Sequence, residues 1–328
     1  DAAGWQAERG GQSVTVLPTR TVAKPWGRTD LPLAFGGTAP EPIGEVWFEP
    51  PPALDSLLIK YIFTSEKLSV QCHPSDDQTL AMGLGRQGKE ECWLVLDAEP
   101  GAQLAIGFER EIDAATMQAA MVDGSIEQLL TWHPVRAGDF FYIPANTVHA
   151  IGAGITLVEV QQNSDITYRL YDYGRPRELH VEQGAAVALR QPYPEHLHQK
   201  VPPRGAARLV DGPHFRLDRL DGAPDPAAAA RYPGPLLIVP LDCDVTVAGT
   251  RLAPWAGGHI EFAEGGAGLP VLVVHGSGGG HEAAHAGVEA VVVVDLAHFL
   301  EVVGVALHVR AFHLGAREAE HHIVGSER

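Results

Sequence analysis

Residues 138–149 read Gly-Asp-Phe-Phe-Tyr-Ile-Pro-Ala-Asn-Thr-Val-His. This order predicts a glycine turn, a short apolar strand, a tight turn over Pro144–Asn146 and a second strand that begins at His149. A histidine held at the start of a strand and aimed inward can bind a metal ion. For a histidine on its own, however, a hydrogen-bonded place in the core is the simpler interpretation.

Short apolar runs of the same kind recur along the chain. They are rich in β-branched or aromatic residues and are bounded by Gly, Pro, Asp or Asn, which is typical of strands in a sandwich or barrel. The first group comprises residues 57–63, 68–72, 92–96, 103–108, 139–143 and 155–160, and the second comprises 215–219, 235–239, 244–248 and 259–262. We therefore predict a mainly β protein with two β domains of similar character.

Residues 111–131 (EIDAATMQAAMVDGSIEQLLT) differ from the rest because their apolar residues follow a helical spacing. The pair Asp123-Gly124 interrupts this pattern, so we predict two short helices as a small insertion. Asp113 is the expected N-cap of the first helix, and Pro134 is expected to stop the second.

The Pro-rich stretch 191–204 predicts a linker between the two domains. We place a catalytic, metal-binding domain at 1–190 and a second β domain at 205–328. The end of the chain, 263–328, is atypical because it contains a Gly-rich run and eight histidines. Such a composition is compatible with adventitious metal binding, but a variable or poorly packed tail is the simpler interpretation, and we assign it no chemistry.

The composition excludes several classes of protein. With 24 basic and 41 acidic residues the formal charge is −17, which opposes binding to a phosphate backbone by counterion release. Three cysteines are too few for a disulfide framework. No apolar run approaches the roughly 20 residues of a membrane span, and the first residues have no signal-peptide layout. We therefore expect a soluble cytoplasmic protein with neither nucleic acid nor membrane as a partner.

Two further segments carry metal-ligating residue types. In SVQCHPSD (69–76), Gln71 and His73 are two residues apart on a predicted strand, so their side chains point to one face. In GKEECW (88–93), Lys89 and Glu91 have the same spacing at the start of another strand. Each segment therefore presents a pair of polar side chains to one side of a sheet.

Taken together with His149, these segments predict a metal site. His73, Glu91 and His149 form a set of two histidines and one carboxylate, and Gln71 adds a neutral oxygen donor. This mixture suits Zn²⁺ and other divalent first-row ions. Two histidines and a carboxylate also bind ferrous iron in oxygenases, so the ligand types alone leave the chemistry open.

Six ordered motifs resemble those of the type I mannose-6-phosphate isomerases, in particular the bacterial short form of that zinc-dependent cupin family. They are KPWG (24–27), VQCHP (70–74), GKEECW (88–93), GDFFYIPANTVHAIG (138–152), QQNSDITYRLYDYGR (161–175) and RPRELH (175–180). The resemblance runs through residues 20–190 and extends loosely over the second β domain. It implies two cupin-like β-barrel (jelly-roll) domains, one zinc ion per chain and interconversion of mannose 6-phosphate and fructose 6-phosphate. We expect a monomer or a weak homodimer.

Carried over residue by residue, the resemblance assigns roles within these motifs. The metal ligands fall on His73, Glu91 and His149, and Gln71 occupies the position of a fourth ligand in long-form members. The active-site arginine and lysine fall on Arg169 and Lys89, and an acidic position ten residues before the arginine falls on Glu159.

The chain departs from the family pattern in three places. Cys72 stands where a valine is common, and Glu90 stands where threonine or serine is usual. An extra carboxylate at position 90 is expected to alter the charge environment of Lys89. Beyond about residue 263 the match to the final strands of the family ends.

The proposed isomerisation moves a carbonyl between C1 and C2 and therefore needs a base and positive charge near an enediolate. We assign the base to Glu159. The alternative is that Glu159 only orients a ligand histidine. Arg169 is permanently cationic and suits the enediolate oxygens or the phosphate. Lys89, two residues from a ligand, can bind phosphate or polarise an oxygen.

The phosphate site is less clearly marked, because the chain has no Gly-x-x-x-x-Gly-Lys-Ser/Thr loop. The candidates are Lys60, Arg175 and Arg177, although the two arginines are equally explained as a solvated pair that bridges Asp172 or Glu178. Trp26 is a candidate wall of the sugar pocket, and an aromatic side chain at such a place is also a common core residue.

Two other functions remain compatible with the pattern. One is a sugar-binding cupin without catalysis, in which the metal only holds the fold together and Arg169 is dispensable. The other is a metal-dependent oxygenase, which would require iron and consume oxygen.

Overall fold

The computed structural model describes residues 14–202, 205–220, 227, 231, 232 and 236–241, together with the strands 245–247, 250–252, 258–260, 272–276 and 289–294. In chain order, the helices and strands of the first half are β1 (Val14–Val16), β2 (Thr19–Asp30), β3 (Thr38–Phe48), β4 (Leu57–Phe63), β5 (Val70–Cys72), α1 (Asp76–Ala81), β6 (Glu91–Ala98), β7 (Gln103–Phe108), α2 (Ala114–Asp123), α3 (Ile126–Leu129), β8 (Leu130–Pro134), β9 (Asp139–Ile143), β10 (His149–Ile151), β11 (Ile155–Gln162), β12 (Tyr168–Tyr171) and α4 (Val181–Val187). They are followed by β13 (His198–Lys200), β14 (Ala207–Asp211), β15 (Phe215–Leu220), β16 (Leu236–Pro240), β17 (Val245–Val247), β18 (Thr250–Leu252), β19 (Gly258–Ile260), β20 (Leu272–Gly276) and β21 (Glu289–Val294).

Two antiparallel sheets pack face to face to form the part that carries the predicted site. One has seven strands in the order β13-β9-β6-β11-β4-β3-β2, and the other has five in the order β12-β5-β10-β7-β8. Apolar side chains of both sheets meet in one core cluster, for example Trp93 and Leu157 from the first sheet with Ile106 and Ile151 from the second. The architecture is therefore a β sandwich of the jelly-roll kind, and in the described residues its sheets do not join into a closed barrel.

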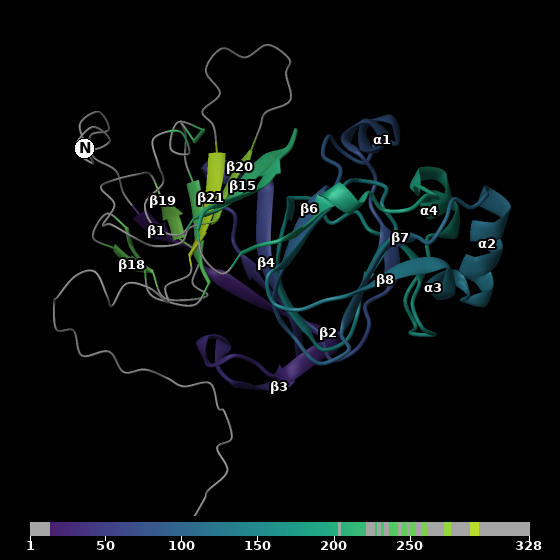
Figure 1. Cartoon of the computed structure of the whole chain (residues 1–328), viewed down its shortest axis with the longest axis horizontal. Helices are drawn as coiled ribbons and strands as arrows, with labels where there is room; N and C mark the ends of the chain where they lie inside the picture. Colours follow the sequence, from purple (N-terminus) through teal and green to yellow (C-terminus); the bar gives the residue numbers. More distant parts are fainter. Residues whose placement is uncertain are drawn as a thin grey trace, which may run out of the picture. The chain divides into compact units, whose positions relative to one another are not determined.

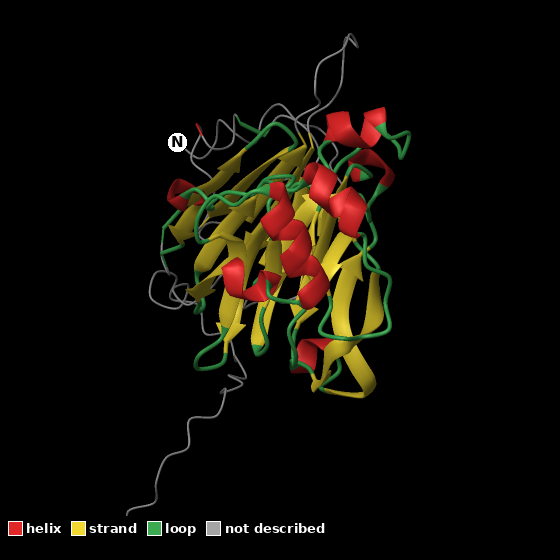
Figure 2. Cartoon of the chain, turned by 90° about the vertical axis from the view of Figure 1, so that its right-hand side faces the viewer, coloured by secondary structure: helices red, strands yellow, loops and turns green. Residues whose placement is uncertain are grey.

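The outer faces of both sheets are also covered. Helices α2, α3 and α4 lie over the five-stranded sheet, as Figures 1 and 2 show, and Met117, Ile126 and Val187 of these helices belong to a cluster with strand residues. On the other side, β14, β15 and β16 pack on the seven-stranded sheet through a third cluster, which includes Phe215 and Leu237. Because both faces are buried, strands such as β4 are apolar almost throughout.

The alternation of side chains along β6 determines where polar residues can enter the sandwich. Cys92 and Leu94 point to the outer cluster, whereas Trp93 and Val95 point to the cluster between the sheets. Glu91 lies two residues before Trp93 and therefore also faces the space between the sheets. The same alternation on β11 turns Glu159 inward.

The structure confirms a mainly β protein with few helices. The predicted strands 57–63, 103–108 and 139–143 coincide with β4, β7 and β9, and the second group of apolar runs corresponds to β15, β16, β17 and β19. Two short helices occur in the predicted interval. Asp113 caps the first of them and accepts a hydrogen bond from Thr116 N at 2.7 Å.

The predicted role of Pro134 is wrong. Helix α3 ends at Leu129, and Leu130–Pro134 form strand β8, which pairs with β7. Leu130 is buried and has extended backbone angles, so packing against the sheet ends the helix before the proline. Pro134 is tolerated because β8 is the edge strand of its sheet.

The division into two β domains stays a proposal. Two strands pair across the expected boundary between them. Strand β13 lies within the expected linker 191–204 and pairs with β9 of the first sheet. Strand β1 pairs with β19, which belongs to the sheet of the second half. Of the tail 263–328, β20 and β21 are described and the remainder lies outside the described residues. Within the described part, none of the helices is long and apolar enough to cross a membrane.

Candidate metal centre and active site

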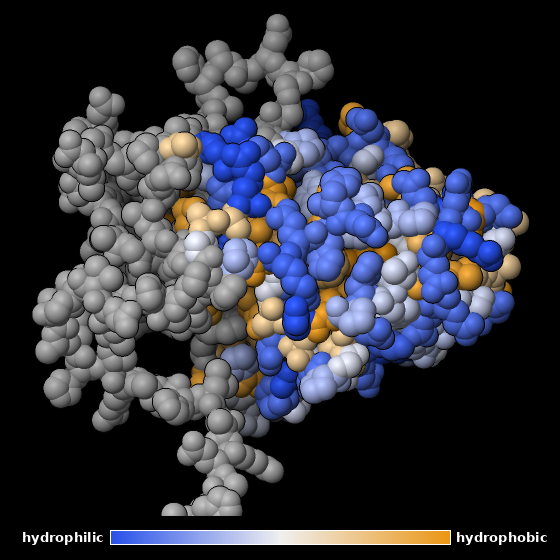
Figure 3. All heavy atoms as spheres, viewed as in Figure 1, coloured by the Kyte–Doolittle hydropathy of each residue, from blue (hydrophilic) through white to orange (hydrophobic). Residues whose placement is uncertain are grey.

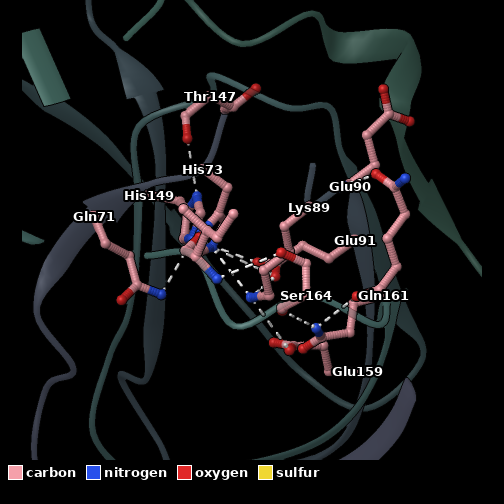
Figure 4. A network of polar contacts seen from close by, with 12 residues as sticks. Gln71, His73, Lys89, Glu90, Glu91, Thr147, His149, Glu159, Gln161 and Ser164 are labelled. Carbon is pink, nitrogen blue, oxygen red and sulfur yellow. Dashed lines mark hydrogen bonds and ion pairs between the residues drawn. The ribbon is translucent and has the colours of Figure 1, made fainter. Parts of the chain in front are cut away.

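Three buried side chains from three strands converge between the two sheets (Figure 4). His149 is the first residue of β10, Glu91 is the first residue of β6, and His73 follows β5 directly. His149 Nε2 lies 3.3 Å from Glu91 Oε1, and His73 Nε2 lies 3.6 Å from Glu91 Oε2. One ligand atom from each residue falls within 4.8 Å of the others, so the group can hold one metal ion.

Hydrogen bonds to the main chain fix the orientation of both imidazoles. His73 Nδ1 donates to the carbonyl of Ile166 at 2.9 Å, and His149 Nδ1 donates to the carbonyl of Thr147 at 2.9 Å. The proton of each neutral ring is therefore on Nδ1, and the lone pair of each Nε2 points toward Glu91. This arrangement is the one that a metal-binding histidine requires.

The Pro144–Asn146 turn connects the two histidine segments. Asn146 has a left-handed backbone with φ of 71°, which asparagine tolerates better than most residues. Its N–H donates to the carbonyl of His73 at 2.7 Å. The turn therefore sets the distance between His73 and the strand that begins at His149, and the structural role expected for Asn146 is observed.

The electrostatic state of the three side chains favours cation binding. Burial, together with repulsion from Lys89, lowers the pKa of His73 well below its usual value, and burial also lowers the pKa of His149. Burial by itself raises the pKa of Glu91, but the ammonium group of Lys89 outweighs burial through its charge and its hydrogen bond, and the net shift is downward. Two neutral imidazoles and a carboxylate are the protonation states that bind a divalent ion.

The contacts of Glu91 also show that a positive charge is accommodated at this group. Lys89 Nζ, a cation, donates to Glu91 Oε2 and lies 3.1 Å from His73 Nε2. Glu91 Oε1 is completely buried and accepts no hydrogen bond from the described residues. A buried oxygen of this kind is costly unless a cation or donor satisfies it, so the donor set matches the chemistry of a metal site.

Gln71 lies in one row with two predicted site residues. It is directly opposite His149 on β10 and opposite Arg169 on β12. Gln71 Nε2 is 3.3 Å from His149 Nε2, and Gln71 Oε1 accepts a hydrogen bond from Ser69. The row of Arg169, Gln71 and His149 forms the wall of the site that the five-stranded sheet provides.

A second row, on the seven-stranded sheet, holds Glu159. This residue is paired with Lys60 on β4 and with Trp93 on β6. Its carboxylate binds Lys60 Nζ at 2.9 Å and accepts a hydrogen bond from Trp93 Nε1 at 2.9 Å. Because both ligand histidines donate to main-chain carbonyls, Glu159 orients neither of them by a hydrogen bond.

The ammonium group of Lys60 is held in the buried ion pair with Glu159. Burial lowers the pKa of Lys60, but the carboxylates of Glu159 and Glu45 outweigh burial and raise it. Lys89 Nζ lies 3.7 Å from the same Glu159 oxygen. Glu159 is therefore held between two ammonium groups at the edge of the metal group.

Two cavities of about 260 and 540 Å³ share lining residues and reach Lys89, which contacts His73 and Glu91. Both are lined by Lys24, Glu45, Lys60, Lys89, Asp165 and Thr167. Trp26, Gln71, Glu159, Arg169 and Arg177 line the smaller one. Most of the predicted site residues thus share one cleft, which is of a size that admits a small phosphorylated sugar.

Arg175 and Arg177 differ in their relation to this cleft. Arg177 binds Asp172 through two hydrogen bonds of 2.6 Å and lines the smaller cavity. Arg175 binds Asp172 and Glu66 and is not among the residues that line either cavity. Both arginines therefore form the ion pair with Asp172 that was the alternative to a phosphate contact.

Arg169 is held by the main chain and by the same carboxylate. Its Nη1 donates to the carbonyl of Glu178 at 2.7 Å, and its Nε is 3.9 Å from Asp172. His180 Nδ1 accepts a hydrogen bond from the backbone N–H of Arg169 at 3.1 Å and so supports the strand that carries Arg169.

The structure also answers the sequence-based expectations for Trp26 and Glu90. Trp26 is a core residue, 3% exposed, and also lines the smaller cavity, so both interpretations hold. The side chain of Glu90 points to the opposite side of β6 from Lys89 and accepts a hydrogen bond from Tyr142. Because neighbouring residues of a strand face opposite sides of the sheet, Glu90 does not add a carboxylate to the site.

Sequence reasoning missed Lys24 and Glu45. Lys24 lies 3.5 Å from Glu45, whose carboxylate also accepts a hydrogen bond from Trp47 at 2.7 Å. Lys24 belongs to the KPWG motif and could have been found there, whereas the inward direction of Glu45 depends on the pairing of β3 with β4. Among the described residues, the second half contributes no group of metal-ligating side chains.

Curated proteins include relatives that match part of this chain. A mannose-6-phosphate isomerase of Streptococcus mutans is 44% identical over 137 residues, which are 40% of this chain and 43% of that protein. A mannose-6-phosphate isomerase of Bacillus subtilis is 37% identical over 175 residues, or 50% of this chain and 54% of that protein. The chain thus spans about half the length of the curated relatives that it matches. A scan against family models finds no match.

Solved structures confirm the fold. The mannose 6-phosphate isomerase of Bacillus subtilis has a TM-score of 0.64 at 24% identity, with 80% of this chain and 99% of that chain covered. A zinc-bound mannose 6-phosphate isomerase has a TM-score of 0.57 at 14% identity, with 75% and 94% covered. The resemblance inferred from the six motifs is confirmed by these relatives.

Proposed function

We propose that this chain is a zinc-dependent aldose–ketose isomerase that interconverts mannose 6-phosphate and fructose 6-phosphate. The observation that carries the proposal is a buried group of three metal-ligating side chains in contact with Lys89, which lines one cleft together with Glu159 and Arg169. The identity of 37–44% to mannose-6-phosphate isomerases, over 175 and 137 residues, supports it.

His73, Glu91 and His149 would hold the ion, and Gln71 is adjacent to them. Once bound, a divalent ion supplies Lewis-acid chemistry by polarising the substrate carbonyl and its neighbouring hydroxyl. Zinc is the proposed ion because two imidazoles and a carboxylate suit it. The zinc-bound neighbour has the same fold.

Glu159 is the proposed base. It would remove the proton from C2 of the open-chain aldose and return it to C1, while the O2 hydroxyl proton passes to O1, so that the carbonyl moves to C2 through an enediolate. Its position inside the cleft, next to the metal group and restrained by Trp93 and Lys60, supports this role. The ion pair makes Lys60 a residue that positions the base, in place of the phosphate contact that the sequence suggested.

Positive charge would stabilise the enediolate and the phosphate. Lys89 and Arg169 line the cleft on opposite sheets and are the proposed partners of the developing oxyanion. Arg177, whose guanidinium lines the same cavity, is the proposed phosphate contact. Arg175 is a weaker candidate because its side chain is occupied by Glu66 and Asp172.

We further propose a cytoplasmic location and a monomer or weak homodimer, without nucleic acid or membrane partners. The net charge of −17 supports the absence of a nucleic acid partner. Cys72 and Cys92 are free and buried, which suits a reducing compartment.

The test is to incubate zinc-loaded protein with mannose 6-phosphate and to follow the C2 ketone carbon of fructose 6-phosphate by ¹³C NMR. We expect conversion of the phosphorylated sugar and none of free mannose. A folded, zinc-loaded sample that binds the sugar phosphate without converting it would instead indicate a sugar-binding protein. Consumption of oxygen with iron would indicate an oxygenase.

A further inference from the structure

The turn between β14 and β15, residues 211–215, packs on Tyr142 of β9, the strand that pairs with the strand carrying Glu91. The ring of Phe215 meets the ring of Tyr142 edge to face, with centroids 6.1 Å apart. Gly212 is close enough that a Cβ there would lie 3.1 Å from the Tyr142 hydroxyl. That hydroxyl donates to Glu90, so the turn reaches the residue next to a metal ligand.

His214, at the tip of this turn, faces three polar side chains of the first sandwich. Its Nδ1 accepts a hydrogen bond from Gln162 Nε2 at 3.2 Å and lies 3.6 Å from Asp76 Oδ2. Its Nε2 lies 3.7 Å from Glu90 Oε1. The imidazole thus occupies the space between two carboxylates that belong to different segments.

These three partners connect the segments on which the metal ligands lie. Asp76 Oδ1 accepts from the N–H of Gly88 at 2.6 Å and from Gln162 Nε2 at 2.9 Å. The N–H of Glu90 donates to Gln162 Oε1 at 2.9 Å. One hydrogen-bond network therefore joins the segment after His73, the segment around Glu91 and the end of β11. His214 contacts this network from the turn between β14 and β15.

We propose that His214 is a positioning residue for the metal centre, through which the second β region holds the His73 and Glu91 segments at the spacing that a divalent ion requires. Outer partners of metal ligands set the distance and direction of the ligands and so contribute to metal affinity. The inference concerns affinity for the metal and does not depend on which reaction the site performs.

The experiment measures the zinc affinity of the full chain by competition with a chromophoric chelator. The variants are His214→Ala and His214→Gln, and thermal unfolding of the zinc-free proteins confirms that they are folded. His196→Ala is the matched control, because it removes an exposed histidine for which no side-chain contact is described. We expect His214→Ala to bind zinc about tenfold more weakly than the natural chain, and the control to be unchanged.

The variant His214→Gln keeps an acceptor for Gln162 and is expected to lose less affinity than His214→Ala. Combining His214→Ala with Glu90→Gln is expected to cost less than the two single losses added together, because both residues act in one network. Zinc affinities for both His214 variants equal to that of the His196→Ala control would overturn the proposal. Additive losses in the double variant would also contradict it.

Discussion

At the scale of single residues, the metal group depends on where two protons lie. The Nδ1 protons of His149 and His73 are donated to the main-chain carbonyls of Thr147 and Ile166, so that both Nε2 atoms carry the lone pair with which an imidazole coordinates a metal. No carboxylate is needed for this orientation, which leaves Glu159 available for proton transfer. The assignments of ligand and base can therefore be tested separately.

Replacing His149 by Ala is expected to weaken zinc binding by about 100-fold or more, since loss of an outer partner alone costs about 10–100-fold. Chelator competition measures the affinity. The His196→Ala variant is the control, and its affinity is expected to equal that of the natural chain. An affinity of His149→Ala equal to the control would remove this residue from the ligand set.

Replacing Glu159 by Gln is expected to lower kcat by about 10²–10⁴-fold, the usual contribution of a general base, while zinc affinity stays unchanged. The amide oxygen of Gln can still accept the hydrogen bond from Trp93, so local geometry is retained. Steady-state kinetics and chelator competition on the same preparation distinguish the roles. A loss of zinc affinity that parallels the loss of activity would favour the alternative in which Glu159 only supports the ligands.

At the scale of secondary-structure elements, the segment that leads into α1 and the segment that leads into β6 meet at Gly88. A Cβ at this position would lie 2.4 Å from the carbonyl oxygen of Pro74 and 2.5 Å from the carbonyl carbon of Ser75. Gly88→Ala is therefore expected to separate the His73 segment from β6 and to destabilise the fold by about 1–3 kcal/mol. Urea unfolding gives the stability and chelator competition the zinc affinity, and both are expected to fall. Unchanged values would show that the contact is not needed.

The loop after β12 is organised by one buried carboxylate. Asp172 is 2% exposed and binds Arg175 and Arg177, with Arg169 3.9 Å away. Asp172→Asn is expected to lower the free energy of unfolding by about 2 kcal/mol. The loss is smaller than for a fully buried pair, because the guanidinium groups remain partly exposed. Asp165→Asn, at an exposed aspartate, is the control in urea unfolding. Equal stability of the two variants would contradict this role.

Local sequence signals selected His73, Glu91 and His149, which the structure brings into one group, because each lies in a short, ordered motif. The spacing of Lys89 and Glu91 and the turn before His149 are properties of a few consecutive residues. The partner of Glu159 could not be predicted in the same way, since the ion pair with Lys60 depends on the register of β11 against β4. The end of α3 was missed for a related reason, because packing of Leu130 against the sheet overrides the local signal of Pro134.

At the scale of the whole molecule, the cleft differs in charge from the chain around it. The smaller cavity is lined by five cationic side chains and three carboxylates, whereas the chain carries a net charge of −17. On the face shown in Figure 3, the described surface is mostly hydrophilic, with apolar side chains in scattered patches. A local positive field of this kind attracts an anionic substrate against the overall repulsion.

This contrast predicts a dependence on salt. Because ions screen the attraction between the cleft and a phosphate, KM for mannose 6-phosphate is expected to rise by about tenfold between low ionic strength and 0.5 M salt. Steady-state kinetics in potassium chloride measure this change, and a neutral osmolyte at equal osmolarity is the control. A KM that does not change with potassium chloride would contradict electrostatic capture.

The central claim is that this chain isomerises a sugar phosphate with a metal ion held by His73, Glu91 and His149. The most direct test is a coupled assay of mannose 6-phosphate conversion on zinc-loaded protein, on chelator-treated protein and on treated protein with zinc restored. We predict activity that disappears with the chelator and returns with zinc. Conversion that persists after complete removal of the metal, or its absence from folded and zinc-loaded protein, would contradict the claim.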